Sequence, residues 1–134
     1  AYPARLRDIY DPPLLLYGKG AMPLFDEEAA VAVVGTRKCT PYGTGAASQL
    51  GYEMARQGGL VASGLARGID SAALEGALRG GGFTAAVLGG GVDVIYPPEN
   101  RRLYEDIAAT GRSIRRAPRR WGGTFPCGTA SSAD

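Results

Sequence analysis

The stretch Ser63-Gly64-Leu65-Ala66-Arg67-Gly68-Ile69-Asp70 decides the fold. It follows the apolar residues 60–62 and precedes residues 71–78, whose apolar positions have helical spacing. The sequence therefore predicts a strand, a tight glycine turn and the start of a helix. Glycines permit close approach of a ligand to the backbone, and a helix N-terminus offers unpaired N–H groups to an anion. The turn therefore suits a phosphate, unless its glycines serve packing alone.

The same pattern recurs on either side of this stretch. Residues 31–34 are a continuous apolar run, typical of a strand buried on both faces, and they end in Gly35-Thr36-Arg37. Residues 83–88 end in Gly89-Gly90-Gly91, and residues 42–57 carry one helical apolar stripe. Strand starts about 25–28 residues apart are typical of βαβ units. The sequence predicts an α/β, Rossmann-like, doubly wound, mostly parallel sheet with helices on both faces.

A last unit is predicted near the end of this region. Residues 92–95 have the composition of a strand, and Tyr96-Pro97-Pro98 has that of a turn. A helix with an apolar stripe follows, and Asn100 is well placed as its N-cap.

The three glycine turns favour a ligand that carries phosphate. The ends of parallel strands meet at one edge of a sheet, where open α/β sheets bind ligands. A dinucleotide fits poorly, because Gly35 is followed by Thr36-Arg37-Lys38 rather than by a G-x-G-x-x-G fingerprint. Arg37 instead offers a planar, permanently charged fork for phosphate oxygens. The alternative role for Arg37 is a surface ion pair with an acid such as Asp70.

Composition limits the chemistry further. The 134 residues suit one domain, and 45% hydrophobic with 21% charged residues is ordinary for a soluble globular protein. The chain has no histidine, which excludes a His-based catalytic centre, and Cys39 and Cys127 lack metal-ligand or redox spacing. No apolar stretch is long enough to span a bilayer and no signal peptide opens the chain, so we expect a cytoplasmic protein without a cofactor. Residues 112–134 carry a charge of +4 and the rest of the chain −2, so any nucleic-acid contact must be local.

Four motifs in order carry a family resemblance. They are residues 31–37, Tyr42-Gly43, residues 63–70, and residues 87–100, which include Tyr96-Pro97-Pro98-Glu99-Asn100. Together they closely resemble the DprA/Smf family (DNA processing protein A), from the start of the chain to about Gly111.

The resemblance implies a function. Members bind single-stranded DNA, protect incoming DNA, dimerise, and load the RecA recombinase during natural transformation. We therefore expect single-stranded DNA, RecA and a second copy of this chain as partners, with no membrane contact and no enzymatic activity. Tyr42 and Tyr96 are candidate surfaces for base stacking, with a structural role as the alternative. The residues expected to bind nucleic acid are Gly35, Thr36, Arg37, Lys38, Ser63, Gly64, Ala66, Arg67, Gly68, Asp70, Gly90, Tyr96 and Asn100.

The resemblance also divides the chain. Residues 1–30 are the expected lead-in, residues 31–111 the Rossmann-like DNA-binding core, and residues 112–134 an aberrant, disordered tail. After Gly111 the family continues with apolar residues and a later F-P-x-R-N-R, whereas this chain has five arginines and then Phe125-Pro126-Cys127. Reading each codon one base earlier permits Arg-Asn-Arg. We therefore hypothesise a frame slip and a C-terminally truncated domain.

Two positions within the motifs depart from the pattern of the family. Many members carry His at the position of Leu74, and the position of Pro98 is often basic.

Two other functions are alternatives to DNA binding. Related Rossmann-like proteins of the LOG type are nucleoside monophosphate phosphoribohydrolases, and Gly89-Gly90-Gly91 is the nearest match to their motif, without its Thr and Glu. No paired carboxylates lie beside a glycine turn to serve as general acid and base. A plain structural or oligomerisation domain would bind neither nucleotides nor DNA.

Overall fold

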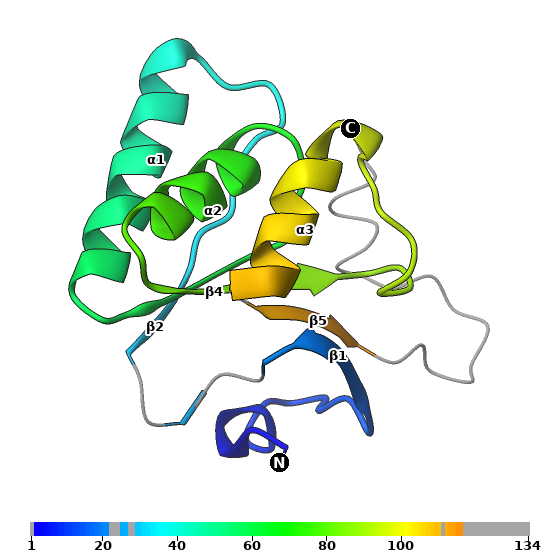
Figure 1. The fold of residues 1–134 in the computed structure, drawn as a ribbon. Helices are drawn as coiled ribbons and strands as arrows, with labels where there is room; N and C mark the ends of the chain where they lie inside the picture. The colour runs from blue at the N-terminus through cyan, green and yellow to red at the C-terminus, as the bar shows by residue number, and fades with distance from the viewer. Residues whose placement is uncertain (1, 22–24, 27–28, 111, 117–134) are drawn as a thin grey trace.

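The centre of the molecule is one five-stranded sheet in the order β1-β5-β4-β3-β2 (Figure 1). The computed structural model describes residues 2–21, 25–26, 29–110 and 112–116, the last range as backbone only. Strands β2 to β5 run parallel, and β1 pairs antiparallel with β5 at one edge. The predicted α/β, Rossmann-like, mostly parallel fold is confirmed. The strands are β1 (Leu16–Gly20), β2 (Ala30–Ala32), β3 (Leu60–Ser63), β4 (Phe83–Leu88) and β5 (Arg112–Arg116).

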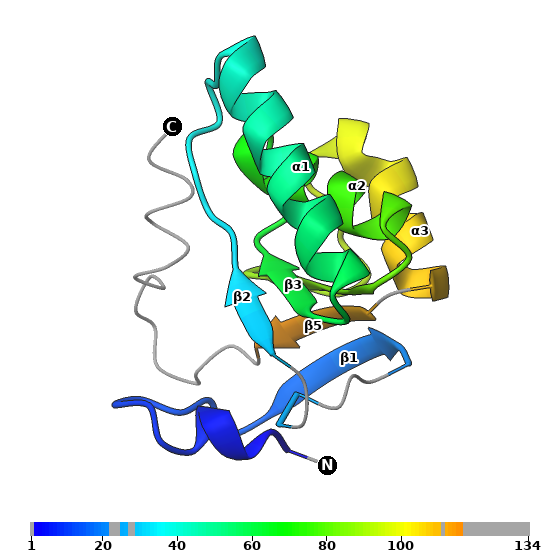
Figure 2. The same ribbon diagram turned by 90° about the vertical axis from the view of Figure 1, so that its left-hand side faces the viewer.

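Three α-helices connect the parallel strands: α1 (Pro41–Arg56), α2 (Ile69–Arg79) and α3 (Arg101–Thr110). Figures 1 and 2 show all three on the same face of the sheet. The strand order explains this, because each connection moves one strand in the same direction and right-handed crossovers then stay on one face. The expectation of helices on both faces is not met by the described α-helices, since the strand order does not reverse between β2 and β5.

The sequence provides a clear start for α1. Thr40 Oγ1 accepts the N–H of Gly43 at 3.1 Å, and Pro41 stands at the first helical position. Further along, α1 crosses α2 at very short range. A Cβ atom at Gly51 would overlap the backbone of Ala73 on α2. This contact between helix backbones fixes the relative positions of α1 and α2, and therefore of the turns that precede them.

The core lies between the helices and the sheet. One cluster joins Val33 and Val61 to alanines of α1 and α2. The second packs Leu65 and Leu88 against Tyr104 and other apolar side chains of α2 and α3. Leu65 belongs to the glycine turn and is fully buried. Burial of a leucine stabilises a fold by about 1.5–3 kcal/mol, so this turn is anchored in the core.

Residues 92–95 form no strand, contrary to the prediction. The run is short and leads into Pro97 and Pro98, which have no N–H to donate to a ladder. Instead, the short 3-10 helix η2 (Pro98–Asn100) leads into α3. The strand that pairs with β4 at this side is β5, not residues 92–95.

The expected disorder from Arg112 onward is wrong for the first five residues. Strand β5 (Arg112–Arg116) pairs with β4 on one side and with β1 on the other. The tail was predicted to be disordered because its sequence loses apolar periodicity. Residues 112–116 form a strand despite this, because their backbone pairs with a strand on each side. The predicted division at residues 30 and 111 stays a prediction, and strands from all three segments belong to this one sheet. The rest of the predicted tail lies outside the described residues.

Candidate nucleic-acid interface

The predicted site residues follow the carboxyl ends of the parallel strands. Beyond β2, Val33 donates its N–H to the Ala62 carbonyl at 2.9 Å, and the chain then bends at residues 37–38. Ser63 ends β3, and its Oγ donates to the Val33 carbonyl at 2.5 Å. The ends of β2 and β3 are therefore tied together where their turns begin.

Asp70 joins these two turns. Its Oδ1 accepts the N–H of Gly35 at 3.1 Å, and its Oδ2 accepts the N–H of Gly64 at 3.0 Å. The side chain is buried. Gly68 adds a second junction: its φ is +83°, and a Cβ atom there would overlap the backbone of Thr36. Only glycine combines this backbone angle with such a close approach.

These contacts correct the expected phosphate cradle of backbone N–H groups. The N–H groups of Gly35 and Gly64 already bind an anion from within the chain, the Asp70 carboxylate. At the start of α2, the N–H groups of Ile69 and Ser71 donate to backbone carbonyls. These four N–H groups are therefore not available to a phosphate at this edge.

Arg37 and Lys38 bring two cations to the turn after β2. Lys38 is exposed and Arg37 is half-buried. Thr36 Oγ1 accepts the Lys38 N–H at 3.2 Å and shapes the turn. A Cβ atom at Gly68 would lie 2.9 Å from the Arg37 Cα, so this turn packs directly on the turn before α2. A guanidinium in this place suits a ligand with phosphate oxygens.

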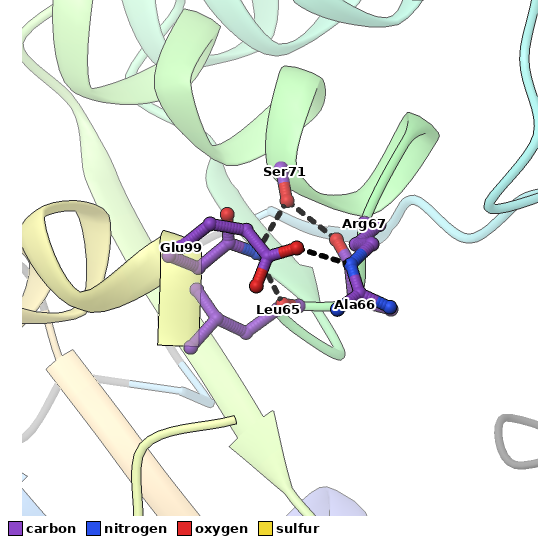
Figure 3. A network of polar contacts seen from close by, with 6 residues as sticks. Leu65, Ala66, Arg67, Ser71 and Glu99 are labelled. Atoms are coloured by element: carbon purple, nitrogen blue, oxygen red, sulfur yellow. Dashed lines mark hydrogen bonds and ion pairs between the residues drawn. The ribbon is translucent and has the colours of Figure 1, made fainter. Parts of the chain in front are cut away.

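The turn before α2 carries its own cation, Arg67, within a polar network (Figure 3). Arg67 Nε donates to Glu99 Oε1 at 2.5 Å, and the two side chains are 47% and 55% exposed. The hydrogen bond and charge of Glu99 raise the pKa of Arg67, and the hydrogen bond from Arg67 lowers the pKa of Glu99. Both groups are therefore charged at neutral pH.

Two further side chains hold the backbone of this turn. Leu65 has a φ of +60°, a left-handed conformation that is uncommon for any residue except glycine. Asn100 Nδ2 donates to the Leu65 carbonyl and to Ser71 Oγ, both at 2.8 Å. Ser71 Oγ donates in turn to the Ala66 carbonyl at 2.5 Å. Asn100 immediately precedes α3, at the predicted N-cap position, and its amide nitrogen binds this turn.

Two tyrosines expose their rings at this site, and Gly90 lies in the turn after β4 at the same end of the parallel strands. Tyr42, in the first turn of α1, is 85% exposed and Tyr96 is 60% exposed. The Arg67 guanidinium carbon lies 6.0 Å from the centroid of the Tyr96 ring. Both rings have the exposure that base stacking requires. Gly90 is exposed, and a Cβ atom there would meet nothing within 4 Å.

The predicted contact residues include neither Glu99 nor Ser71, although Glu99 lies within residues 96–100, which the family resemblance assigns to the DNA groove. Glu99 lies 32 residues from Arg67 along the chain, so no local pattern joins the pair. The signal that could have identified Glu99 was its position in the sequence between Tyr96 and Asn100, two of the predicted site residues. Among the described residues, no cluster of three or more His, Cys, Asp or Glu side chains could hold a metal ion. None of the described helices is both long and apolar enough to cross a membrane.

The fold is that of a Rossmann-like α/β protein, with its described α-helices on one face of a mostly parallel sheet. At one edge of this sheet, two joined turns carry Arg37, Lys38 and Arg67. The family model for DNA recombination-mediator protein A matches residues 1–120. The chain belongs to this family, which is the DprA/Smf family that the motifs resemble.

Similar proteins agree with this assignment. The DNA processing protein DprA of Bacillus subtilis is 40% identical over 107 residues, which are 80% of this chain and 36% of that protein. DprA of Streptococcus pneumoniae is 43% identical over 79% of this chain and 37% of that protein. The chain thus spans about a third of the length of these relatives.

Solved structures of the family have the same fold. The crystal structure of DprA from Streptococcus pneumoniae aligns with a TM-score of 0.78 and 37% identity, over 93% of this chain and 42% of that one. DprA from Helicobacter pylori, described for its mode of binding single-stranded DNA, aligns with a TM-score of 0.83 and 30% identity. That alignment covers 98% of this chain and 60% of that one.

Proposed function

We propose that this chain is a single-stranded DNA-binding module that holds the DNA backbone along the carboxyl edge of its sheet. The observation that carries the proposal is the junction of two cation-bearing turns, since the turn with Arg37 and Lys38 packs on the turn with Arg67. Family membership supports the choice of ligand, because DprA of Helicobacter pylori is described as binding single-stranded DNA. Residues 31–111 are the proposed core of this module.

The proposed residues divide into two roles. Arg37, Lys38 and Arg67 contact phosphates, and the exposed rings of Tyr42 and Tyr96 stack on bases. The other proposed residues set the shape of the two turns through the hydrogen bonds and close packing described above. They are Gly35, Thr36, Ser63, Gly64, Ala66, Gly68, Asp70 and Asn100. Gly90, exposed in the turn after β4, stays a proposed contact of the DNA backbone.

A salt titration tests this proposal. We expect a fluorescein-labelled single-stranded oligonucleotide to bind more tightly than the corresponding duplex in fluorescence anisotropy. If three cations each contact one phosphate, the log–log salt slope is about −2. Equal binding of duplex and single strand, or no binding, contradicts the proposal. Release of free base from nucleoside monophosphates would instead favour the LOG-type enzyme.

We also propose that the chain acts in natural transformation as part of a cytoplasmic, non-enzymatic DprA-type protein that dimerises, protects incoming DNA and loads RecA. Family membership supports this proposal. Sedimentation of the chain at several concentrations tests the homodimer. RecA loading is tested by measuring the ATPase activity of RecA on single-stranded DNA that is already coated with a single-strand-binding protein. We expect this activity to rise when the chain is added. An unchanged ATPase rate contradicts the RecA part alone.

A further inference from the structure

Three consecutive residues of the turn before α2 are each held by a different polar contact. The Leu65 carbonyl accepts from Asn100, and the Ala66 carbonyl accepts from Ser71. The third residue, Arg67, is held through its side chain by Glu99 (Figure 3). Glu99 and Asn100 are neighbours in η2, so one short segment fixes both the backbone of the turn and its cation.

We propose that Glu99 is a positioning residue that orients the Arg67 guanidinium toward a phosphate of the bound strand. This inference rests on the proposed function and assigns a role to a carboxylate that the DNA itself would repel. Glu99 binds Nε alone, and an arginine has four further N–H donors on its two terminal nitrogens. Those nitrogens form one edge of the fork, which can bind a phosphate through two parallel hydrogen bonds.

The benefit of such a contact is preorganisation. A free, exposed arginine has many rotamers, and a ligand that binds it must bear the entropy of fixing one of them. Glu99 fixes one rotamer before binding, with the guanidinium near the face of Tyr96. A cation that is already oriented binds with a smaller entropic cost.

The negative charge of Glu99 acts in the opposite sense, so the test must separate charge from orientation. Glu99→Gln and Glu99→Ala remove the same charge. Only glutamine keeps a carbonyl oxygen that can accept the Arg67 Nε hydrogen bond. The ratio of the two affinities therefore measures orientation alone. Glu105→Gln, at an exposed position on α3, measures the general effect of removing one acidic charge.

We expect Glu99→Gln to bind the labelled single strand at least as tightly as Glu105→Gln does. Glu99→Ala should bind about two- to tenfold more weakly than Glu99→Gln, the loss expected for one hydrogen bond. Equal affinities of Glu99→Gln and Glu99→Ala overturn the positioning role. If Glu99→Ala binds at least as tightly as Glu99→Gln and both bind more tightly than Glu105→Gln, Glu99 is a competitor of the phosphate instead.

A second readout needs no DNA. The Arg67 Nε–H signal in a nitrogen-15 correlation spectrum should stay sharp and protected from exchange in Glu99→Gln, and should broaden in Glu99→Ala. An Nε–H signal that is identical in all variants overturns the inference even if the chain binds DNA. Conversely, if the parent chain fails to bind the oligonucleotide while the Nε–H signal changes as expected, the proposed function fails and the orientation of Arg67 by Glu99 stands.

Discussion

Asp70 accepts a hydrogen bond from the backbone nitrogen of Gly35, which stands 35 residues earlier in the chain, at 3.1 Å. Its second carboxylate oxygen accepts from Gly64 at 3.0 Å. One buried acid therefore holds the turn after β2 against the turn after β3. The edge that we propose for DNA is organised by an internal anion, and the cations around it are placed by that arrangement.

We predict that Asp70→Asn destabilises the fold by about 1.5–3 kcal/mol, the range for hydrogen bonds to charged groups. The amide nitrogen of asparagine cannot accept, so one of the two glycine N–H groups loses its partner. Urea unfolding followed by circular dichroism measures the change. Asp106→Asn, at an exposed position on α3, should leave the unfolding midpoint in place. An equal midpoint for Asp70→Asn would show that the carboxylate contacts contribute nothing.

Gly68→Ala should destabilise the fold more than Gly58→Ala. Both glycines have a positive φ, +83° and +82°, so alanine is strained at either position, at about 1–2 kcal/mol. Only at Gly68 would the added methyl group also overlap the backbone of Thr36, whereas at Gly58 it meets nothing within 4 Å. The difference in unfolding free energy between the two variants measures how tightly the two turns pack. Equal losses would mean that the turns can separate freely.

Part of the fold could be predicted from the sequence. The apolar run 31–34 forms a strand only over Ala30–Ala32, and this strand lies exposed at the edge of the sheet instead of buried on both faces. Strands β3 and β4 begin and end at the predicted residues, and the predicted helix over residues 42–57 is α1, shifted by one residue. Residues 92–95 were misassigned because three apolar residues beside Asp93 were treated as a strand without asking which backbone would pair with them. β5 was missed for the opposite reason: its residues have little apolar periodicity, and its two neighbours supply the pairing.

The candidate site was harder to predict, because its contacts join distant residues. The sequence placed the right turns at one edge of the sheet but assigned their N–H groups to a phosphate. Only the structure shows Asp70 in that position. The pair of Arg67 and Glu99, and the donation from Asn100 to Leu65, likewise depend on how η2 packs on the turn.

Gly51→Ala and Gly45→Ala should change stability in opposite directions. Both lie in α1, where alanine has a higher helix propensity than glycine by about 1 kcal/mol. A Cβ atom at Gly45 meets nothing within 4 Å, so this variant should gain part of that energy. At Gly51 the methyl group would overlap the backbone of Ala73 and force α1 away from α2. Thermal unfolding of the two variants gives the comparison, and stabilisation by both would contradict the close helix crossing.

Thr84→Val should stabilise the protein by about 1 kcal/mol. Thr84 lies in β4 with no exposed surface, and its hydroxyl has no hydrogen-bond partner among the described residues. Burial of an unsatisfied hydroxyl is unfavourable, and valine has nearly the same shape. Thr110→Val is the contrasting variant, because its hydroxyl donates to the Asp106 carbonyl at 2.6 Å. A loss of stability in Thr84→Val would reveal a partner for that hydroxyl.

Arg37→Ala should weaken binding of a single-stranded oligonucleotide by about 1.5–3 kcal/mol, the range for hydrogen bonds to charged groups. The loss of this positive charge should also reduce the magnitude of the log–log salt slope by about 0.7, one phosphate contact. Arg37→Lys should recover only part of the affinity, because an ammonium lacks the bidentate fork. Arg56→Ala is the matched control, since Arg56 lies in the last turn of α1, away from the turn where that helix begins. Anisotropy titrations at several salt concentrations measure both quantities. If folded Arg37→Ala binds like Arg56→Ala, with the same salt slope, Arg37 does not contact the DNA.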